Sequence, residues 1–117
     1  MKTGIFLDDE RNVKDAFWMN YPTNVDWIVV RTFNEFTNAV RSNQDKEYLV
    51  SFDHDLQDFS AMDGRELTGY DCVKFLVDFC MQYGKVLPEA FYHTQNPIGK
   101  TNMECYMNNA AEFMSRS

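Results

Sequence analysis

Four short apolar runs, each followed by polar residues, divide the chain. They cover residues 4–7, 27–30, 48–52 and 89–92. Runs of this length, rich in β-branched and aromatic residues and bounded by polar segments, are typical of β-strands. The third run, Tyr48-Leu-Val-Ser-Phe52, shows little alternation of apolar and polar residues. This pattern predicts a strand that is buried on both faces.

Segments with apolar residues at helical spacing separate and follow these runs. The predicted helices begin at Asn12, Thr32, Thr68 and Thr101. The last three starts carry a capping box, in which a threonine is followed three residues later by an acidic residue. The helix from Thr68 is expected to end near Gly84, because glycine readily adopts the left-handed conformation at a helix end.

This alternation of strands and helices predicts an α/β fold with a parallel sheet and helices on both faces. Residues 1–117 are expected to form one domain. The predicted strand order is 2-1-3-4, a receiver-like (flavodoxin-like) arrangement. In that order the first and third strands are neighbours, and the direction of winding reverses between them. Ligands of such sheets bind at this point, beyond the carboxyl ends of the strands.

Acidic residues follow the two strands that are predicted to be neighbours. The predicted metal ligands are Asp8, Asp9, Asp53 and Asp55. Either pair alone is equally typical of a helix cap or a solvated turn. Both pairs at one sheet edge would repel each other unless a proton or a cation lay between them. Carboxylate oxygens suit Mg²⁺ or Mn²⁺, so the sequence predicts a site for one of these ions.

Both histidines of the chain also follow predicted strands. His93 comes directly after the fourth strand, opposite the acids. It is interpreted either as a catalytic proton donor or as a structural hydrogen-bonding residue. His54 lies between two of the acids, and three roles stay open for it: metal ligand, acid–base group, or hydrogen-bonding partner of the neighbouring loop.

Basic and amide side chains near the same edge are candidates for binding a phosphate. They are Arg11, Arg31, Asn96 and Lys100. Each is also typical of a solvated surface. Gly99-Lys100-Thr101 resembles the end of a P-loop, but Thr94 stands where the first glycine should be. A glycine-containing loop before a capped helix could still present backbone N–H groups and Lys100 to an anion.

Residues 56–69 form a long stretch without helical or strand periodicity. A loop of this length in a compact domain is more often functional than idle. We therefore expect it to be mobile and to close over a bound ligand.

Composition limits the classes of partner. The net charge is −7 and the basic residues do not cluster, which argues against duplex DNA as a partner. No apolar run approaches the ~20 residues that span a bilayer, and the first 25 residues do not resemble a signal peptide. The three cysteines, Cys72, Cys80 and Cys105, lack a C-x-x-C spacing. They are expected to be reduced and buried, in a cytoplasmic protein.

Four motifs give the chain a family resemblance. They are Leu7-Asp-Asp-Glu-Arg11, Ser51-Phe-Asp-His-Asp-Leu56, Thr68-Gly-Tyr-Asp-Cys72 and His93-Thr-Gln-Asn-Pro-Ile-Gly-Lys-Thr-Asn-Met103. Together they resemble the cyclic-phosphate-processing receiver-like family, a diverged branch of the response-regulator receiver fold in bacteria and phages. The resemblance implies a phosphoesterase acting on cyclic phosphates of nucleotides or RNA ends. For a phage protein the compartment would be the host cytoplasm.

The sequence also departs from ordinary receivers. Asp53 matches the phosphoacceptor position, but the fifth strand and its lysine find no match in these residues. Tyr92-His93 replaces the hydroxyl expected at the end of the fourth strand. Two alternatives to the phosphoesterase therefore stay open. One is a non-catalytic module that binds a nucleotide or a protein, and the other is a phosphorylatable receiver. The sequence does not indicate an oligomeric state.

Overall fold

The computed structural model describes residues 1–116 and contains one four-stranded parallel sheet. Its strands are β1 (Lys2–Leu7), β2 (Val25–Val30), β3 (Tyr48–Phe52) and β4 (Glu89–Tyr92). Their order across the sheet is β2-β1-β3-β4, so the predicted α/β receiver-like fold and its strand order are confirmed. The first two strands each begin two residues earlier than predicted.

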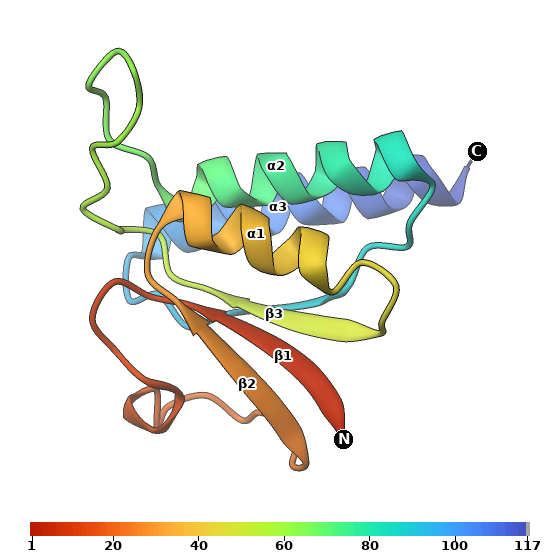
Figure 1. Ribbon diagram of the computed structural model, residues 1–117, viewed down its shortest axis with the longest axis horizontal. Helices are drawn as coiled ribbons and strands as arrows, with labels where there is room; N and C mark the ends of the chain where they lie inside the picture. The colour runs from red at the N-terminus through yellow and green to blue at the C-terminus, as the bar shows by residue number, and fades with distance from the viewer. Residues whose placement is uncertain (117) are drawn as a thin grey trace.

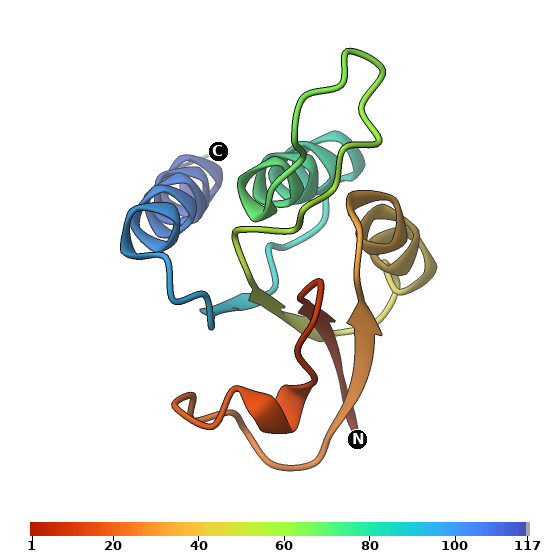
Figure 2. The same ribbon diagram turned by 90° about the vertical axis from the view of Figure 1, so that its left-hand side faces the viewer.

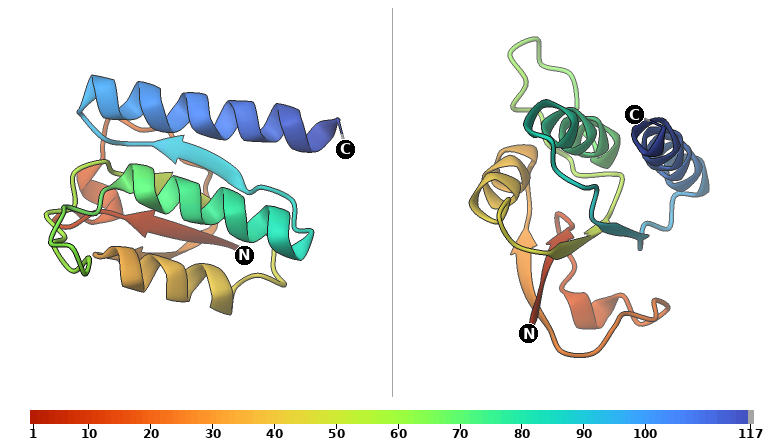
Figure 3. Two further views of the ribbon diagram at one scale, coloured as in Figure 1. Left: turned by 90° about the horizontal axis from the view of Figure 1, so that it is seen from above. Right: turned by 90° about the vertical axis from the view of Figure 1, so that its right-hand side faces the viewer.

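Three α-helices, α1 (Phe33–Ser42), α2 (Gly69–Tyr83) and α3 (Pro97–Ser115), cover one face of the sheet (Figures 1 and 3). The helix predicted from Asn12 is a single 3₁₀ turn, η1 (Val13–Asp15), on the opposite face (Figure 2). The step from β1 to β2 crosses the sheet in the opposite direction to the later steps. A right-handed crossover must then place this connection on the other face.

Two of the predicted helix starts are confirmed. At α1 the Thr32 hydroxyl accepts a hydrogen bond from the Glu35 N–H at 3.1 Å. At α2 the Asp71 carboxylate accepts from the Thr68 N–H at 2.8 Å. The helix ends at Gly84, which has the expected left-handed conformation with φ of 64°. These caps satisfy backbone groups that have no partner within the helix.

The predicted start of the last helix at Thr101 is wrong, because α3 begins four residues earlier, at Pro97. The Asn96 side chain accepts a hydrogen bond from the Gly99 N–H at 3.0 Å, and proline fits the first helical position. Thr101 lies inside the helix and its hydroxyl donates to the Pro97 carbonyl. The expected glycine-containing loop is therefore the first turn of α3.

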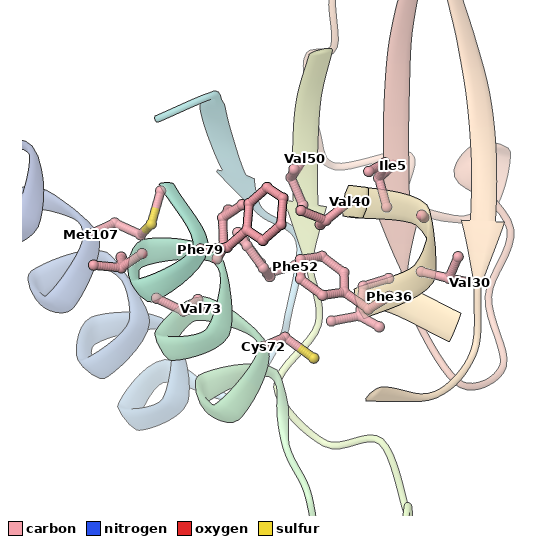
Figure 4. Packing of buried hydrophobic residues seen from close by; sticks show 14 of the residues in the cluster. Ile5, Val30, Phe36, Val40, Val50, Phe52, Cys72, Val73, Phe79 and Met107 are labelled. Carbon is pink, nitrogen blue, oxygen red and sulfur yellow. The ribbon is translucent and has the colours of Figure 1, made fainter. Parts of the chain in front are cut away.

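The main core lies between the sheet and the three helices (Figure 4). All five residues of β3 are buried, as its apolar run predicted. On the opposite face, Tyr21 from the segment after η1 packs against Trp27 and Phe91, with ring centroids 4.9 and 5.4 Å away. The segment between β1 and β2 thus covers part of the face that the helices leave open.

The three cysteines are free, as predicted, but one lies in an unexpected place. Cys72 and Cys80 are buried, whereas Cys105 is exposed on α3. Its position turns outward because the buried side of α3 carries Met103 and Met107. Among residues 1–116, no helix combines the length and apolar character needed to cross a membrane.

Candidate functional site

The ends of three neighbouring strands, β1, β3 and β4, bring Asp8, Asp53 and His93 together. These strand ends face the viewer in Figure 2. The sheet pairing extends one residue beyond each strand: the Asp53 N–H donates to the Leu7 carbonyl at 3.0 Å, and the His93 N–H donates to the Phe52 carbonyl at 3.1 Å. As a result the three side chains lie side by side. One ligand atom from each lies within 4.8 Å of the others, and all three residues are buried.

Asp8 is the most tightly held carboxylate of the site. Its Oδ1 accepts hydrogen bonds from the N–H groups of Glu10 and Arg11, both at 2.8 Å. Its Oδ2 lies 3.0 Å from Nε2 of His93. Burial alone would raise the pKa of Asp8, but the hydrogen bonds from His93 and the two backbone groups outweigh burial and lower the pKa to about 2. Asp8 is therefore a carboxylate anion at neutral pH.

His93 is fully buried behind Asp8, and both of its ring nitrogens have partners. Nε2 faces Asp8, and Nδ1 lies 2.7 Å from the hydroxyl of Ser51. That hydroxyl lies 2.6 Å from the Tyr21 hydroxyl, and the Phe6 ring stacks on the imidazole with centroids 4.2 Å apart. When Nε2 donates to the Asp8 carboxylate, a neutral imidazole accepts from Ser51 at Nδ1. This arrangement fixes the orientation of Asp8.

Asp53 is buried beside Asp8 but has fewer hydrogen-bond donors. Its Oδ1 accepts from the His54 N–H at 2.9 Å. Burial raises the pKa of Asp53, and the negative charge of Asp8 raises it further. Two carboxylates this close repel each other when both are charged, and a cation between them would offset that repulsion. The oxygen-rich donor set fits a hard divalent ion, so Asp8, Asp53 and His93 could hold a metal.

An open cleft of about 440 Å³ lies above these acids. Its lining comes from the ends of β1 and β3 and from the connection between β4 and α3: Asp8, Asp9, Glu10, Arg11, Asp53, Asp55, Gln57, Thr94, Gln95, Asn96 and Pro97. The half-buried Asp9 has a raised pKa, owing to burial and then to the charge of Asp8. All four predicted metal ligands, Asp8, Asp9, Asp53 and Asp55, therefore line the cleft.

His54 lies next to the cleft wall and is tightly packed. Its Nδ1 lies 2.9 Å from Oδ1 of Asp55, and its carbonyl accepts from the Gly69 N–H at 2.7 Å. Its ring rests on Gly99, where an added Cβ would lie 2.5 Å from the imidazole. Gly69 and Gly99, which belong to two of the family motifs, therefore both contact His54. About 19 % of the His54 side chain is exposed.

The four predicted phosphate-binding residues separate into two groups. Arg11 and Asn96 line the cleft. Arg31 instead donates to the backbone carbonyls of Asp8 and Arg11, at 3.1 and 2.6 Å, and so holds the connection after β1. Lys100 is exposed on the first turn of α3, outside the cleft lining.

Sequence reasoning missed several residues that build the site. Ser51 is a polar residue within a buried apolar strand, which was a signal that its hydroxyl has a buried hydrogen-bond partner. Tyr21 gave no such signal, because its hydroxyl reaches Ser51 only after the chain folds over the sheet. Thr94, Gln95 and Gln57 also line the cleft. Thr94 and Gln95 belong to the last family motif and Gln57 to the long loop, but none of the three was predicted as a site residue.

Comparison with known proteins adds one match. The family model described as the cyclic-phosphate processing receiver domain matches residues 3–109, which confirms the resemblance found in the sequence motifs. No curated protein and no solved structure matches the chain.

Proposed function

The chain belongs to the cyclic-phosphate processing receiver family, and from this premise we propose that it is a divalent-metal-dependent phosphoesterase that opens cyclic phosphates of nucleotides or RNA ends. The observation that carries the proposal is the pair of buried carboxylates, Asp8 and Asp53, at the floor of an open cleft. Buried acids in contact are costly, and they are most simply explained by a cation that binds between them.

In this proposal Asp8, Asp53 and Asp9 would hold Mg²⁺ or Mn²⁺, and Asp55, which lines the same cleft, would contact a water bound to the ion. Such an ion, when bound, polarises a phosphoryl oxygen and lowers the pKa of bound water. Arg11 and Asn96 bind the phosphate from the wall of the cleft. The Arg11 guanidinium offsets the negative charge that develops on the phosphoryl oxygens.

We propose different roles for the two histidines. From the sequence, His93 was predicted to be the proton donor, with His54 as the alternative, and neither role has been tested. Its complete burial and the partners of both ring nitrogens support a positioning role on Asp8 instead. His54 is the imidazole that solvent reaches, and Asp55 orients its Nδ1. We therefore assign proton transfer to the leaving alkoxide to His54.

The test is hydrolysis of a nucleoside 2′,3′-cyclic phosphate with Mg²⁺ or Mn²⁺. Wild-type protein should open the ring, and Asp53→Asn should abolish both hydrolysis and stabilisation by the metal. His54→Gln should lower kcat by about 10²- to 10⁴-fold and leave stabilisation by the metal intact. His93→Gln should weaken metal affinity by about 10- to 100-fold, as expected for a residue that orients a ligand. Loss of kcat alone in His93→Gln would restore it as the proton donor.

A phosphorylatable receiver is the second candidate, because Asp53 occupies the phosphoacceptor position of that fold. Incubation with acetyl phosphate and Mg²⁺ followed by intact mass measurement tests it. Phosphate on Asp53 with no hydrolysis of cyclic phosphates would favour the receiver. Binding of a cyclic nucleotide with neither reaction would favour a non-catalytic module.

A further inference from the structure

Two adjacent aromatic residues, Phe17 and Trp18, are exposed, and Trp18 contacts Arg11 of the cleft. The Phe17 residue is 85 % exposed and the Trp18 residue 37 %. Their rings meet edge to face, with centroids 5.2 Å apart. Both follow η1, in the connection between β1 and β2. Exposure of aromatic surface to water is unfavourable, and packing within the chain gives no reason for it here.

Trp18 is held in a fixed orientation by the cleft wall. Its indole N–H donates to the backbone carbonyl of His93 at 3.1 Å. The next residue along the chain, Thr94, lines the cleft. The hydrogen bond to the His93 carbonyl thus ties the indole ring to the residue that precedes Thr94 in the wall of the proposed phosphate site. An aromatic ring with an anchored polar end is well suited to a ligand that needs a flat surface.

Arg11 links the indole to the inside of the cleft. Its guanidinium carbon lies 5.3 Å from the centre of the Trp18 ring, within the range of a cation–π interaction. Its Nη2 donates to the Gln95 side chain at 3.2 Å, and its Nη1 lies 3.5 Å from Oδ2 of Asp8. Trp18, Gln95 and Asp8 therefore together hold the guanidinium group in place. About 35 % of the Arg11 side chain stays exposed and can contact a ligand.

The cleft itself offers no surface on which a base could stack. Among its lining residues in the described part of the chain, none is aromatic, and most are acids or amides. Such a lining suits a phosphate, an ion and the hydroxyl groups of a sugar. A base attached to that sugar would extend to the rim, where Arg11 and Trp18 lie.

We infer that Arg11, Trp18 and Phe17 form a base-stacking subsite, so that the substrate is a nucleotide or an RNA end rather than a base-free cyclic phosphate. This inference rests on the proposed function of the cleft. Bases stack on aromatic rings and on guanidinium planes. Because every base has a flat π surface, purines and pyrimidines should both bind. Loss of one stacking partner should weaken binding by about 5- to 100-fold.

The experiment compares two probes that differ only in the base. They are adenosine 2′,3′-cyclic phosphate and methyl ribofuranoside 2,3-cyclic phosphate, each titrated with Mg²⁺ present. In a Trp27→Phe background the fluorescence comes from Trp18 alone, since the chain has two tryptophans. The nucleotide should quench this fluorescence, and the base-free ester should not. Calorimetry on the wild type gives the two dissociation constants.

Three variants then locate the effect. Trp18→Ala and Phe17→Ala should weaken binding of the nucleotide and leave the base-free ester unchanged. Phe113→Ala is the control, because Phe113 is 60 % exposed on α3, away from the cleft lining. It should change neither constant. The base-free probe also reports whether loss of the indole hydrogen bond disturbs the phosphate site.

Failure of this inference differs from failure of the proposed function. Equal affinities for the two probes, or equal weakening of both by Trp18→Ala, would overturn the stacking subsite even if both esters are hydrolysed. Quenching of Trp18 by the nucleotide without any hydrolysis would support the subsite and remove the phosphoesterase.

Discussion

Asp8 and Asp53 show how neighbouring residues decide the state of a carboxylate. Both are buried at the end of a strand, yet the pKa of Asp8 is lowered and the pKa of Asp53 is raised. The difference arises from hydrogen bonds, since Asp8 accepts from two backbone N–H groups and from His93. Asp8 is thus the permanent charge of the site. Asp53 is the residue whose charge depends on a cation or on pH.

Asp53→Asn should therefore stabilise the metal-free protein. The substitution removes a charge that is buried next to Asp8, and the amide oxygen can still accept from the His54 N–H. We expect a gain on the order of 1 kcal/mol in the free energy of unfolding, or roughly 3–6 °C in Tm, at pH 7.5 in EDTA. Because the folded-state pKa of Asp53 is raised, the wild type gains stability as pH falls through that pKa. The gain from the substitution should therefore shrink towards pH 4.5.

Asp55→Asn is the matched control for this prediction. The pKa of Asp55 is lowered, chiefly by its hydrogen bond with His54. Loss of that charge should leave the stability unchanged or reduce it. Thermal melts of the three proteins at both pH values decide the matter, and a metal-free Asp53→Asn protein less stable than wild type would contradict the prediction.

The sequence predicted which residues follow each strand, but it did not predict how deeply their side chains are buried. The apolar runs and the acids after them placed Asp8 and Asp53 at one sheet edge from the sequence alone. Phe6 stacks on the His93 ring from another strand, and Tyr21 reaches Ser51, the partner of His93, from the segment that folds over the sheet. Such contacts leave no trace in the local pattern around His93.

At the scale of elements, the start of α2 is fixed against the end of β3. Gly69 is the first residue of the helix, and its N–H donates to the His54 carbonyl. A Cβ at this position would lie 1.9 Å from the Asp53 carbonyl oxygen. This close approach explains why the capping box at Thr68 is followed by glycine. The helix start and Asp53 therefore cannot move independently.

Gly69→Ala should destabilise the protein by about 1–3 kcal/mol, because the backbone of Asp53 must shift to make room. Alanine elsewhere in a helix is usually more stable than glycine by about 0.5–1 kcal/mol, so the sign is diagnostic. Gly99→Ala is the comparison, since its Cβ meets the His54 ring rather than backbone. It should cost less. Chemical denaturation measures both, and a Gly69→Ala protein as stable as wild type would refute the tight contact.

Helix boundaries and the long loop mark the limits of prediction at this scale. The capping boxes at Thr32 and Thr68 were sufficient to place two helices. The Thr101 pattern misled, because the stronger pair of Asn96 and Pro97 came first. The loop before α2 projects beyond the helices (Figure 1). Among residues 57–69, only Gln57 lines the cleft. Closure of this loop over a ligand stays a prediction.

For the whole molecule, the strand order brings distant segments to one site. Asp8 and Asp53 are far apart in sequence but end neighbouring strands, because β1 and β3 pair in register from Thr3 and Tyr48 onwards. The alternation of elements predicted a parallel sheet, and the order 2-1-3-4 was predicted as a receiver-like (flavodoxin-like) arrangement of its four strands. The same alternation predicted a helix on the second face, but the segment that covers this face contains only a short 3₁₀ turn.

Metal binding should stabilise the entire fold rather than the site alone. The proposed ligands join the ends of two central strands, and unfolding of either strand destroys the site. An ion that binds only the folded state adds about 2.7 kcal/mol when its concentration is 100 times Kd. Saturating Mg²⁺ or Mn²⁺ should therefore slow hydrogen exchange of the core amides of Ile5 and Val50 by the same factor, about 100-fold.

The outcome separates a site in the folded core from weak binding at an acidic surface. Asp53→Asn should lose the added protection at both amides. Asp26→Asn also removes one negative charge, but from an exposed position on β2, and this variant should keep the added protection. Equal losses in the two variants would mean that the ion responds only to the net charge of −7. Protection confined to residues next to the cleft would mean that the ion suppresses only local opening. The prediction that metal binding stabilises the whole fold would then be wrong.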